Sequence, residues 1–591
     1  MKKAAIAIAM LLTTSLGSVA HPIDLGFVNK QGGTSTDAKA NGKTAAEAAI
    51  RLPKEMLARY ANPTGAALQN SFRSVRVELP ALKNLVDSIV VWVRTAPDGE
   101  NLATAVATRF KDDGKPTLVQ GWNELSLAQP VAIEADKDYY IGYTYYQRTK
   151  TCATQYYYRG TTGYSYINVG EGWQPWTEGA LCIEAGIDGE AMPLYDFDLQ
   201  GAKGLVEGDG TAAIQARLAN LGQQAAARLT FRVEAGSYVQ TIDVDAHTQP
   251  NTLDTLRFAL PDAASCIAAG TEASVTLTAI DGQPDAWTKD NAAQVVFNYP
   301  RTLLIEEFTT EQCPNCPAMA ERLAEFLHGG SELGKQSVMV CHHAGYHTDG
   351  FTTQDDEAYL WFYNDDGHTF APAVMFNRRP YSETSVGESP VTFPTSQEQI
   401  TAFAEDCLAD PSTLILTANV EDHTADGYVV LTVKGRKLDG FKLDNPRIFV
   451  YLTEDNMPAV SGQAGSGTDN YLHQHIVRGQ NATWGDPLNW ENGAFTYNTS
   501  FDLEDAWKIG DMTLIASVGN YDETNPANCA IENTVAVRLK DVVNGIKAKE
   551  VTEKPVSYTY YNLAGAQLDR PTHGVTIVKG SDGSTRKVIK R

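Results

Sequence analysis

The sequence predicts a multidomain, mainly β chain in which β-sandwich and immunoglobulin-like modules flank a single α/β domain. The chain has 591 residues, whereas one domain usually spans about 100–200 residues. Apolar, aromatic and β-branched runs alternate with Gly, Pro and Asp through most of the chain, as in strands and turns. Only residues 301–410 combine such runs with apolar residues at helical spacing. We therefore expect one α/β domain there, β modules on both sides, and a small β domain at the C-terminal end.

Residues 1–20 have the layout of a secretory signal peptide. Lysines near Met1 precede an apolar run, and Ser18 and Ala20 supply small residues at the cleavage positions. We expect the mature chain to begin at His21. No cysteine follows that site, which argues against a lipoprotein, and no later apolar run is long enough to span a bilayer. The sequence therefore predicts export into a compartment in which disulfides persist.

The chain is acidic, with a formal net charge of -24 at pH 7. No basic cluster interrupts this composition. Such a chain is soluble and is a poor partner for nucleic acid, whose binding requires a basic surface. We therefore expect no nucleic-acid partner.

The β modules are separated by shifts in pattern and composition. Residues 21–192 predict a jelly-roll-like β-sandwich, and residues 193–300 an immunoglobulin-like, adhesion-type domain. Residues 411–540 return to strand-like runs and predict another β-sandwich. Residues 541–557 are rich in Lys, Glu and Pro and predict a linker. Residues 558–591 form the small C-terminal β domain.

The first module contains a dense aromatic segment between Cys152 and Cys182. Because these two cysteines bracket the segment, we expect them to form a structural disulfide. The aromatic residues either form a platform that stacks on a glycan or protein ligand, or serve as sandwich core and cross-strand pairs. They are Tyr156, Tyr157, Tyr158, Tyr164, Tyr166, Trp173 and Trp176.

The α/β domain is organised around a Cys-Pro-Asn-Cys-Pro motif that contains Cys313 and Cys316. A strand-like run at 303–308 leads into the motif, and apolar residues at helical spacing follow it as far as Gly329. Both cysteines are therefore expected in the first turn of a helix. Free backbone N–H groups and the helix dipole favour a thiolate at that position.

Three interpretations of this motif stay open: a redox-active pair, a structural disulfide, and half of a zinc site. Zinc needs two more ligands; Cys341 and His343 are candidates by residue type, but no second Cys-x-x-Cys pair accompanies the motif. We therefore predict no metal and no cofactor. In the redox interpretation Cys313 is the more exposed nucleophile, and Cys316 resolves the mixed disulfide.

The remaining cysteines and one histidine near the motif have local interpretations. Cys341 and Cys407 occupy positions expected in a buried core, and Cys266 is expected to be a buried apolar thiol. The pairing of Cys529 stays open. His343 ends a buried strand-like run, where it either tunes the thiolate or packs at the strand end.

The motif and its approach resemble the thioredoxin superfamily. Glu307 lies six residues before Cys313 and falls on the family's buried carboxylate, and Pro372 precedes a strand where the family has a cis-proline. The resemblance implies a thioredoxin-like fold, proton exchange between Glu307 and Cys316, and a Pro372 that faces the cysteines and an extended substrate. Gln312 stands where the family usually has Trp, so the direction of the redox reaction stays open.

Two further resemblances concern architecture and location. Phe308, the cysteine motif and the alternating His473 and His475 resemble the outer-membrane-protein-28-related family, which has a thioredoxin-like part followed by a β-sandwich. The two histidines would share one face of a strand and could bind a metal, although no third ligand is evident. Residues 558–591 resemble the C-terminal sorting domain of type IX secretion cargo, through an Asn-Leu-x-Gly turn at Asn562 and a basic end. This implies the type IX machinery as a partner and an outer-membrane-surface or extracellular location.

The sequence leaves two functions open. The first is thiol–disulfide exchange with protein thiols or disulfides through Cys313 and Cys316, in a secreted cell-surface protein. The second is a non-enzymatic adhesin or binding protein, with a glycan or protein ligand on its N-terminal domain and a structural disulfide at the motif.

Overall fold

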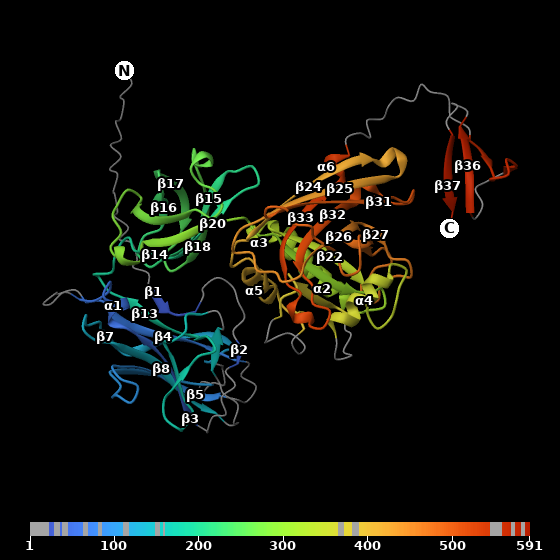
Figure 1. The fold of residues 1–591 in the computed structure, drawn as a ribbon. Helices are drawn as coiled ribbons and strands as arrows, with labels where there is room; N and C mark the ends of the chain where they lie inside the picture. Colours follow the sequence, from blue (N-terminus) through green and yellow to red (C-terminus); the bar gives the residue numbers. More distant parts are fainter. Residues whose placement is uncertain are drawn as a thin grey trace, which may run out of the picture.

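The chain is a multidomain, mainly β protein with one mixed α/β region (Figure 1). The predicted signal peptide, Cys152, Tyr158 and most of the predicted linker lie outside the residues that the structure describes. Within the described part, no helix combines the length and apolar character needed to cross a membrane. The computed structural model describes residues 23–28, 36–37, 45–62, 69–80, 86–109, 117–147, 154–157, 160–364, 371–380, 389–543, 558–568, 574–580 and 585–590.

The first unit is a β-sandwich. A sheet of order β1-β13-β4-β7 packs on a sheet of order β11-β10-β3-β8-β5-β6, and a short sheet β12-β9-β2 lies beside them. Alternate strand residues such as Val75 and Ile141 fill a shared core between the two main sheets. The elements are β1 (Ile23–Gly26), β2 (Thr36–Asp37), β3 (Ala45–Leu52), α1 (Lys54–Leu57), β4 (Ser71–Leu79), β5 (Val86–Arg94), β6 (Ala103–Thr108), β7 (Gly121–Ala132), β8 (Tyr139–Gln147), β9 (Gln155–Tyr157), β10 (Ser165–Asn168), β11 (Gln174–Trp176), β12 (Ala180–Leu181) and β13 (Ile183–Asp188).

The predicted Cys152–Cys182 disulfide is not formed, because Cys182 carries a free, buried thiol. Cys182 lies between β12 and β13, where burial and the neighbouring Glu78 carboxylate raise the pKa of its thiol well above the ordinary value. Within the aromatic segment, Tyr156 and Trp176 are buried and pack edge to face with ring centroids 5.0 Å apart. These two rings belong to the sandwich core. A ligand for this unit stays a prediction.

The second unit is a sheet of order β17-β16-β19-β20-β14-β15-β18 that encloses one core. Its strands are β14 (Phe197–Val206), β15 (Ala212–Asn220), β16 (Ala226–Ala235), β17 (Tyr238–Thr248), β18 (Leu253–Leu260), β19 (Glu272–Ile280) and β20 (Ala292–Asn298). An ion pair joins this unit to the first, since an Arg59 Nη1 lies 3.1 Å from Asp196 Oδ1. Cys266 is exposed, so the predicted buried thiol is wrong. The residue caps a surface 3-10 turn and therefore faces outward.

The third unit spans the predicted α/β domain and the predicted sandwich that follows it. One sheet, of order β23-β21-β22-β29-β26-β32-β33, runs through both, and a second sheet, β24-β25-β31, packs against its far end. The helices are α2 (Cys316–His328), α3 (Glu332–Lys335), α4 (Gln354–Tyr363), α5 (Gln397–Cys407) and α6 (Leu539–Val542). The strands are β21 (Leu303–Thr309), β22 (Ser337–His343), β23 (Ala373–Phe376), β24 (Leu414–His423), β25 (Tyr428–Lys437), β26 (Pro446–Glu454), β27 (Met457–Pro458), β28 (Leu472–His473), β29 (Ile476–Gln480), β30 (Asp486–Pro487), β31 (Ala494–Asp502), β32 (Met512–Asn520) and β33 (Ile531–Arg538).

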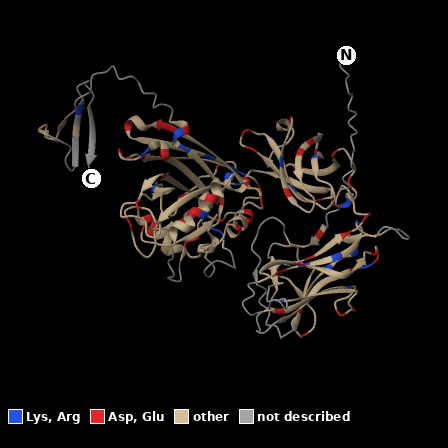
Figure 2. Cartoon of the chain, turned by 180° about the vertical axis from the view of Figure 1, so that it is seen from behind, with Lys and Arg blue, Asp and Glu red and all other residues tan. Residues whose placement is uncertain are grey.

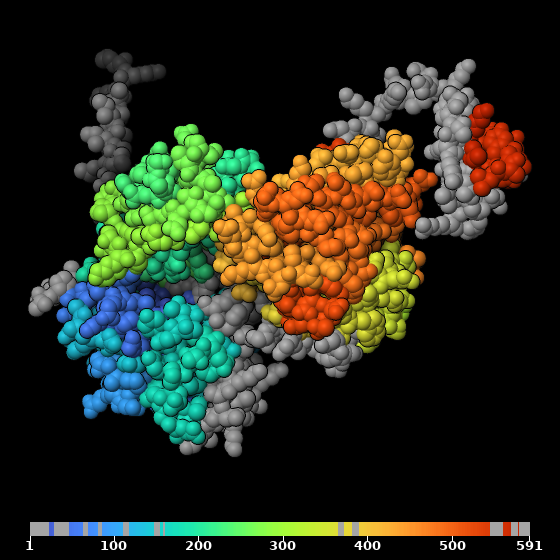
Figure 3. Space-filling model, viewed as in Figure 1, coloured from blue at the N-terminus to red at the C-terminus, as the bar shows by residue number. Residues whose placement is uncertain are grey.

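The boundary that the sequence predicts near residue 410 is not a break in the structure. β22 pairs in parallel with β29 at Cys341 and Ile476, and the Cys341 N–H donates to the His475 carbonyl at 2.8 Å. The space-filling view shows the two parts in continuous contact (Figure 3). Residues from the predicted sandwich can therefore reach the cysteine motif.

Strand β21, which lies between β23 and β22, is buried on both faces. Its odd-numbered residues, such as Ile305, face α2 and α5, and its even-numbered residues, such as Leu304, face α4. Glu306 and Glu307 are adjacent on this strand, so their side chains lie on opposite faces. Each carboxyl group must find its own buried partners.

The C-terminal residues form a small sheet of order β35-β34-β36-β37. Its strands are β34 (Tyr558–Tyr561), β35 (Gln567–Leu568), β36 (Gly574–Gly580) and β37 (Thr585–Lys590). In the first three units, Asp and Glu are scattered over strands and loops with Lys and Arg between them (Figure 2). None of the four strands of the C-terminal sheet pairs with a strand of the first three units in the described part of the chain.

Candidate functional site

The cysteine motif forms the turn between β21 and α2. Cys316 is the first residue of α2, and Cys313 lies in the preceding turn, where its N–H donates to the Thr310 carbonyl at 3.0 Å. The two cysteines form a disulfide. Pro317 occupies the first turn of the helix, where its missing N–H leaves no hydrogen bond unmade. The motif therefore places one sulfur at a helix N-terminus and the other just before it, close to the sequence-based prediction.

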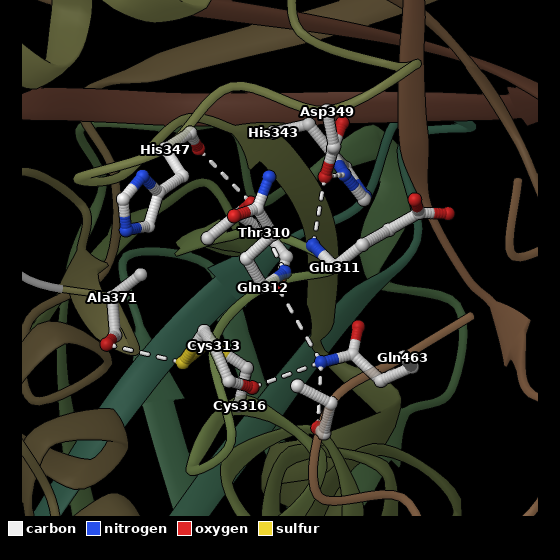
Figure 4. Close-up of a disulfide and its surroundings, with 11 residues drawn as sticks. Thr310, Glu311, Gln312, Cys313, Cys316, His343, His347, Asp349, Ala371 and Gln463 are labelled. Carbon is white, nitrogen blue, oxygen red and sulfur yellow. Dashed lines mark hydrogen bonds and ion pairs between the residues drawn. A yellow bond between two sulfur atoms is a disulfide. The ribbon is translucent and has the colours of Figure 1, made fainter. Parts of the chain in front are cut away.

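Pro372 lies beside the disulfide, as the thioredoxin resemblance implies. The Ala371–Pro372 peptide bond is cis, and the Ala371 carbonyl oxygen is 3.1 Å from Sγ of Cys313 (Figure 4). Cys313 is 6% exposed and Cys316 is 2% exposed. Cys313 is the more exposed residue of the two, but both cysteines are buried.

Glu307 is buried on the face of β21 that lies under α2. Burial raises the pKa of its carboxyl group to about 8. Its hydrogen-bond partner is the Cys341 thiol, whose Sγ is 3.5 Å from Oε2, and burial together with Glu307 raises the pKa of that thiol well above its ordinary range. The predicted burial of Glu307 is therefore present, whereas proton exchange between Glu307 and Cys316 stays a prediction.

An arm from the predicted sandwich, residues 457–473, contacts the other side of the motif. The Glu311 carboxylate accepts hydrogen bonds from the backbone N–H groups of Val460 and Ser461, the latter at 3.0 Å. Nε2 of Gln463 donates to the Cys313 carbonyl at 2.9 Å (Figure 4). Glu311 and Gln463 are both buried. The sequence-based prediction did not include either residue, because their contacts join segments about 150 positions apart.

His343 lies at the end of β22 but does not contact a cysteine sulfur in the described contacts. Its Nδ1 is 2.8 Å from Asp349 Oδ2, which also accepts from the Glu311 N–H at 2.8 Å. Its ring packs edge to face on His473, with centroids 4.8 Å apart. Burial and His343 lower the pKa of His473 to about 4, so His473 is neutral near pH 7. His343 is thus linked to the backbone before Cys313 through Asp349, without a described contact to either sulfur.

The two alternating histidines do not share a strand face. His473 ends β28, whereas His475 has a φ of 57° and lies in the left-handed region between β28 and β29. The two rings have different neighbours, since His473 packs on His343 and His475 Nδ1 lies 3.1 Å from Asp455 Oδ1. Among the described residues, no group of three or more His, Cys, Asp or Glu side chains could hold a metal ion.

A buried ionic cluster lies on the opposite face of β21, and the sequence-based prediction missed it. Glu306 and Arg378 are fully buried and form a bidentate pair, with both N–O distances 2.7 Å. Arg378 Nη2 also donates to the Tyr451 hydroxyl at 2.7 Å, and His342 bridges Glu306 and Asp356. The pair holds the pKa of Glu306 at about 2. Two adjacent acidic residues inside an apolar strand were the available signal, since alternation places one on each face.

Comparisons with known proteins give structural likenesses only. No family model and no curated protein matches the chain. HBP35 of Porphyromonas gingivalis has 19% identity and a TM-score of 0.37, with 49% of this chain and 98% of that chain covered. A domain of the outer membrane lipoprotein Omp28 from the same organism has 20% identity and a TM-score of 0.15, covering 22% of this chain and 88% of that chain. The CARDB domain of the PF1109 protein from Pyrococcus furiosus has 16% identity and a TM-score of 0.14, covering 18% and 90%.

Proposed function

We propose that Cys313 and Cys316 are a redox-active pair that exchanges with thiols and disulfides. The observation that carries this proposal is the position of Sγ of Cys313, which lies before the N-terminus of α2 and 3.1 Å from the carbonyl that precedes Pro372. A helix N-terminus stabilises a thiolate and makes it both a better leaving group and a nucleophile that is ionised near neutral pH. Glu307, protonated at neutral pH, adds a titratable group beneath the motif.

The exchange needs no cofactor and balances as two thiol–disulfide steps. A substrate thiolate attacks Sγ of Cys313, the Cys313–Cys316 bond breaks, and its electron pair leaves on Sγ of Cys316, which takes up a proton. A second substrate thiolate attacks the substrate sulfur of the mixed disulfide and releases Cys313 as a thiolate. Two substrate thiols are oxidised to one disulfide while the protein disulfide is reduced, and the reverse sequence oxidises the protein.

A second function is favoured by a different observation. Both sulfurs are buried, and the arm closes one side of the motif through Gln463. A disulfide of this kind also serves as a permanent clamp in a non-enzymatic surface-binding protein. The two functions differ in the reduction potential of Cys313–Cys316, because structural bridges are more resistant to reduction than exchange sites. A redox titration of this pair in a glutathione buffer therefore tests the proposal.

We further propose that the protein is exported to the outer-membrane surface or the extracellular space by type IX secretion. The support is the signal-peptide pattern of residues 1–20 and the sorting-domain pattern of residues 558–591. Residues 558–591 contain a sheet of their own, which follows the third unit after residues 544–557. A separate terminal sheet is suited to recognition by export machinery without disturbing the third unit.

Deletion of residues 558–591 is expected to leave the protein in the periplasm, because the segment read by the type IX machinery is lost. Fractionation of cells, with surface proteolysis of the full chain as the reference, measures the distribution. A matched control deletes residues 545–550 of the predicted linker and leaves residues 558–591 whole. Normal surface display of the long truncation would refute the proposed route.

A further inference from the structure

The arm (residues 457–473) is a loop whose two ends lie side by side. β27 (Met457–Pro458) pairs with β28 (Leu472–His473), and the Ala459 N–H donates to the Tyr471 carbonyl at 3.1 Å. Its two ends are therefore fixed next to each other, as in an Ω-loop. The residues between them project as one piece toward the cysteine turn.

The tip of the arm is fitted closely to the backbone of the motif. The Ala464 N–H donates to the Glu311 carbonyl at 2.8 Å. A Cβ on Gly465 would lie 2.1 Å from the Pro314 carbonyl oxygen, and Gly465 has a φ of +75°. Only glycine meets both conditions, because it lacks the Cβ and tolerates positive φ. The tip therefore touches the chain between the two cysteines through backbone and hydrogen bonds, without contacting a sulfur in the described contacts.

Cys313 thus lies between two walls. The Ala371 carbonyl lies against the sulfur on one side of Cys313, and Gln463 of the arm lies on the other side of the residue, at the Cys313 carbonyl (Figure 4). The remaining exposure of Cys313 is 6%. The sulfur of an attacking thiol must approach Sγ of Cys313 between these two walls, in line with the disulfide bond. The size of the molecule that carries the thiol therefore decides whether its sulfur can reach Sγ.

We propose that the arm determines substrate specificity, admitting small-molecule thiols of glutathione size and excluding cysteines on folded protein surfaces. This inference rests on the proposed exchange function and names its substrate class. Gln463 and Glu311 are positioning residues, since they hold the arm in place and leave the sulfur chemistry to Cys313 and Cys316. The first exchange step is then limited by access, and the arm changes the rate for bulky thiols more than for small ones.

The first test uses the unmodified protein and two thiol probes: glutathione, and a small folded domain with one exposed surface cysteine. Opening of Cys313–Cys316 is followed by acid quenching and mass spectrometry of the tryptic peptide of residues 302–322, which carries both cysteines. The same two thiols are also reacted with an unhindered aromatic disulfide to calibrate their intrinsic rates. We expect the glutathione-to-protein rate ratio to be at least about tenfold larger on Cys313–Cys316 than on the calibrating disulfide.

The second test loosens the arm with Gln463→Ala, which removes the hydrogen bond to the Cys313 carbonyl. The matched control is Gln474→Ala, an exposed glutamine just after the arm whose described hydrogen bonds go to Asn456 and Leu472 at the base of the arm. We expect Gln463→Ala to raise the rate for the folded-protein thiol by about tenfold while the glutathione rate changes by less than about threefold, and Gln474→Ala to change neither.

The outcomes separate the inference from the proposed function. If both thiols open the wild-type disulfide with the calibrated ratio, exchange stands and the specificity role of the arm is refuted. If neither thiol opens it, the proposed function fails and the inference fails with it. Because the comparison on the wild-type protein decides the matter alone, a Gln463→Ala variant that does not fold leaves the test intact.

Discussion

Replacement of Arg378 by Met should lower the free energy of unfolding of the third unit by about 3–5 kcal/mol. Arg378 and Glu306 are each 0% exposed, so the substitution leaves a carboxylate buried without its bidentate partner. The loss includes the desolvation cost of Glu306, whose pKa of about 2 depends on Arg378. Arg378 also has a φ of 50°, a left-handed conformation that a non-glycine residue keeps only when its contacts demand it.

Urea denaturation, monitored by tryptophan fluorescence, measures this loss. Arg379→Met is the matched control, because Arg379 is the next residue along the chain and is partly exposed. The double variant Glu306→Gln/Arg378→Met should recover most of the stability, since it removes both charges together. A loss below about 1 kcal/mol in Arg378→Met would contradict the assignment of the pair as a buried anchor of β21 and β23.

Replacement of Glu307 by Gln should stabilise the third unit at alkaline pH, by about 4 kcal/mol at pH 8. The folded-state pKa of Glu307 is raised from 4.5 to about 8 by burial, so the group holds its proton in the folded protein while the unfolded chain has already lost it. In this window the folded state binds more protons than the unfolded state, and stability therefore falls as pH rises from about 4.5 to about 8. Gln imitates the protonated acid and removes this fall.

The measurement is the free energy of unfolding of wild type and Glu307→Gln at several values between pH 4.5 and pH 8, and the difference should grow steadily across this range. Glu325→Gln, an exposed carboxyl on α2, serves as the matched control with no such growth. Equal pH slopes for wild type and Glu307→Gln would show that Glu307 is ionised in the folded protein.

The elements at the motif were predictable because local patterns fix them. Apolar spacing and Gly329 located α2, and continuous apolar runs located β21, β22 and β23. The resemblance to the thioredoxin superfamily placed Glu307 in a buried position and Pro372 beside Cys313, and the structure has both. These features depend on short segments whose pattern carries its own information.

The features that the sequence did not reveal depend on contacts between distant segments. Gln463 reaches Cys313, and Arg378 reaches Glu306, only after the chain has folded back across the sheet. In the sequence, the glycines at the tip of the arm look like those of any loop. Only the structure shows that the Pro314 carbonyl packs against Gly465. The shared sheet that crosses the boundary predicted near residue 410 was not evident for the same reason, because the pairing of β22 with β29 joins distant segments that no local pattern specifies.

The cysteine predictions also succeeded where they depended on local pattern and failed where they did not. Cys313 and Cys316 lie three residues apart in one turn, so their disulfide follows from local geometry. The pairing of Cys152 with Cys182 was inferred from bracketing alone, and Cys182 is a free thiol beside Glu78. Burial of Cys341 and Cys407 is confirmed, since both occupy apolar positions on regular elements, whereas Cys266 lies in a surface turn.

The reduction potential of Cys313–Cys316 tests the central claim most directly. The protein is equilibrated in glutathione buffers of defined potential, quenched with acid, alkylated and analysed through the peptide of residues 302–322; Cys266→Ser removes the exposed free thiol from the assay. An exchange site should titrate between about −120 and −270 mV, the range of known thiol–disulfide exchange proteins. A midpoint well below about −300 mV, where structural bridges lie, would contradict exchange and leave the motif as a structural clamp.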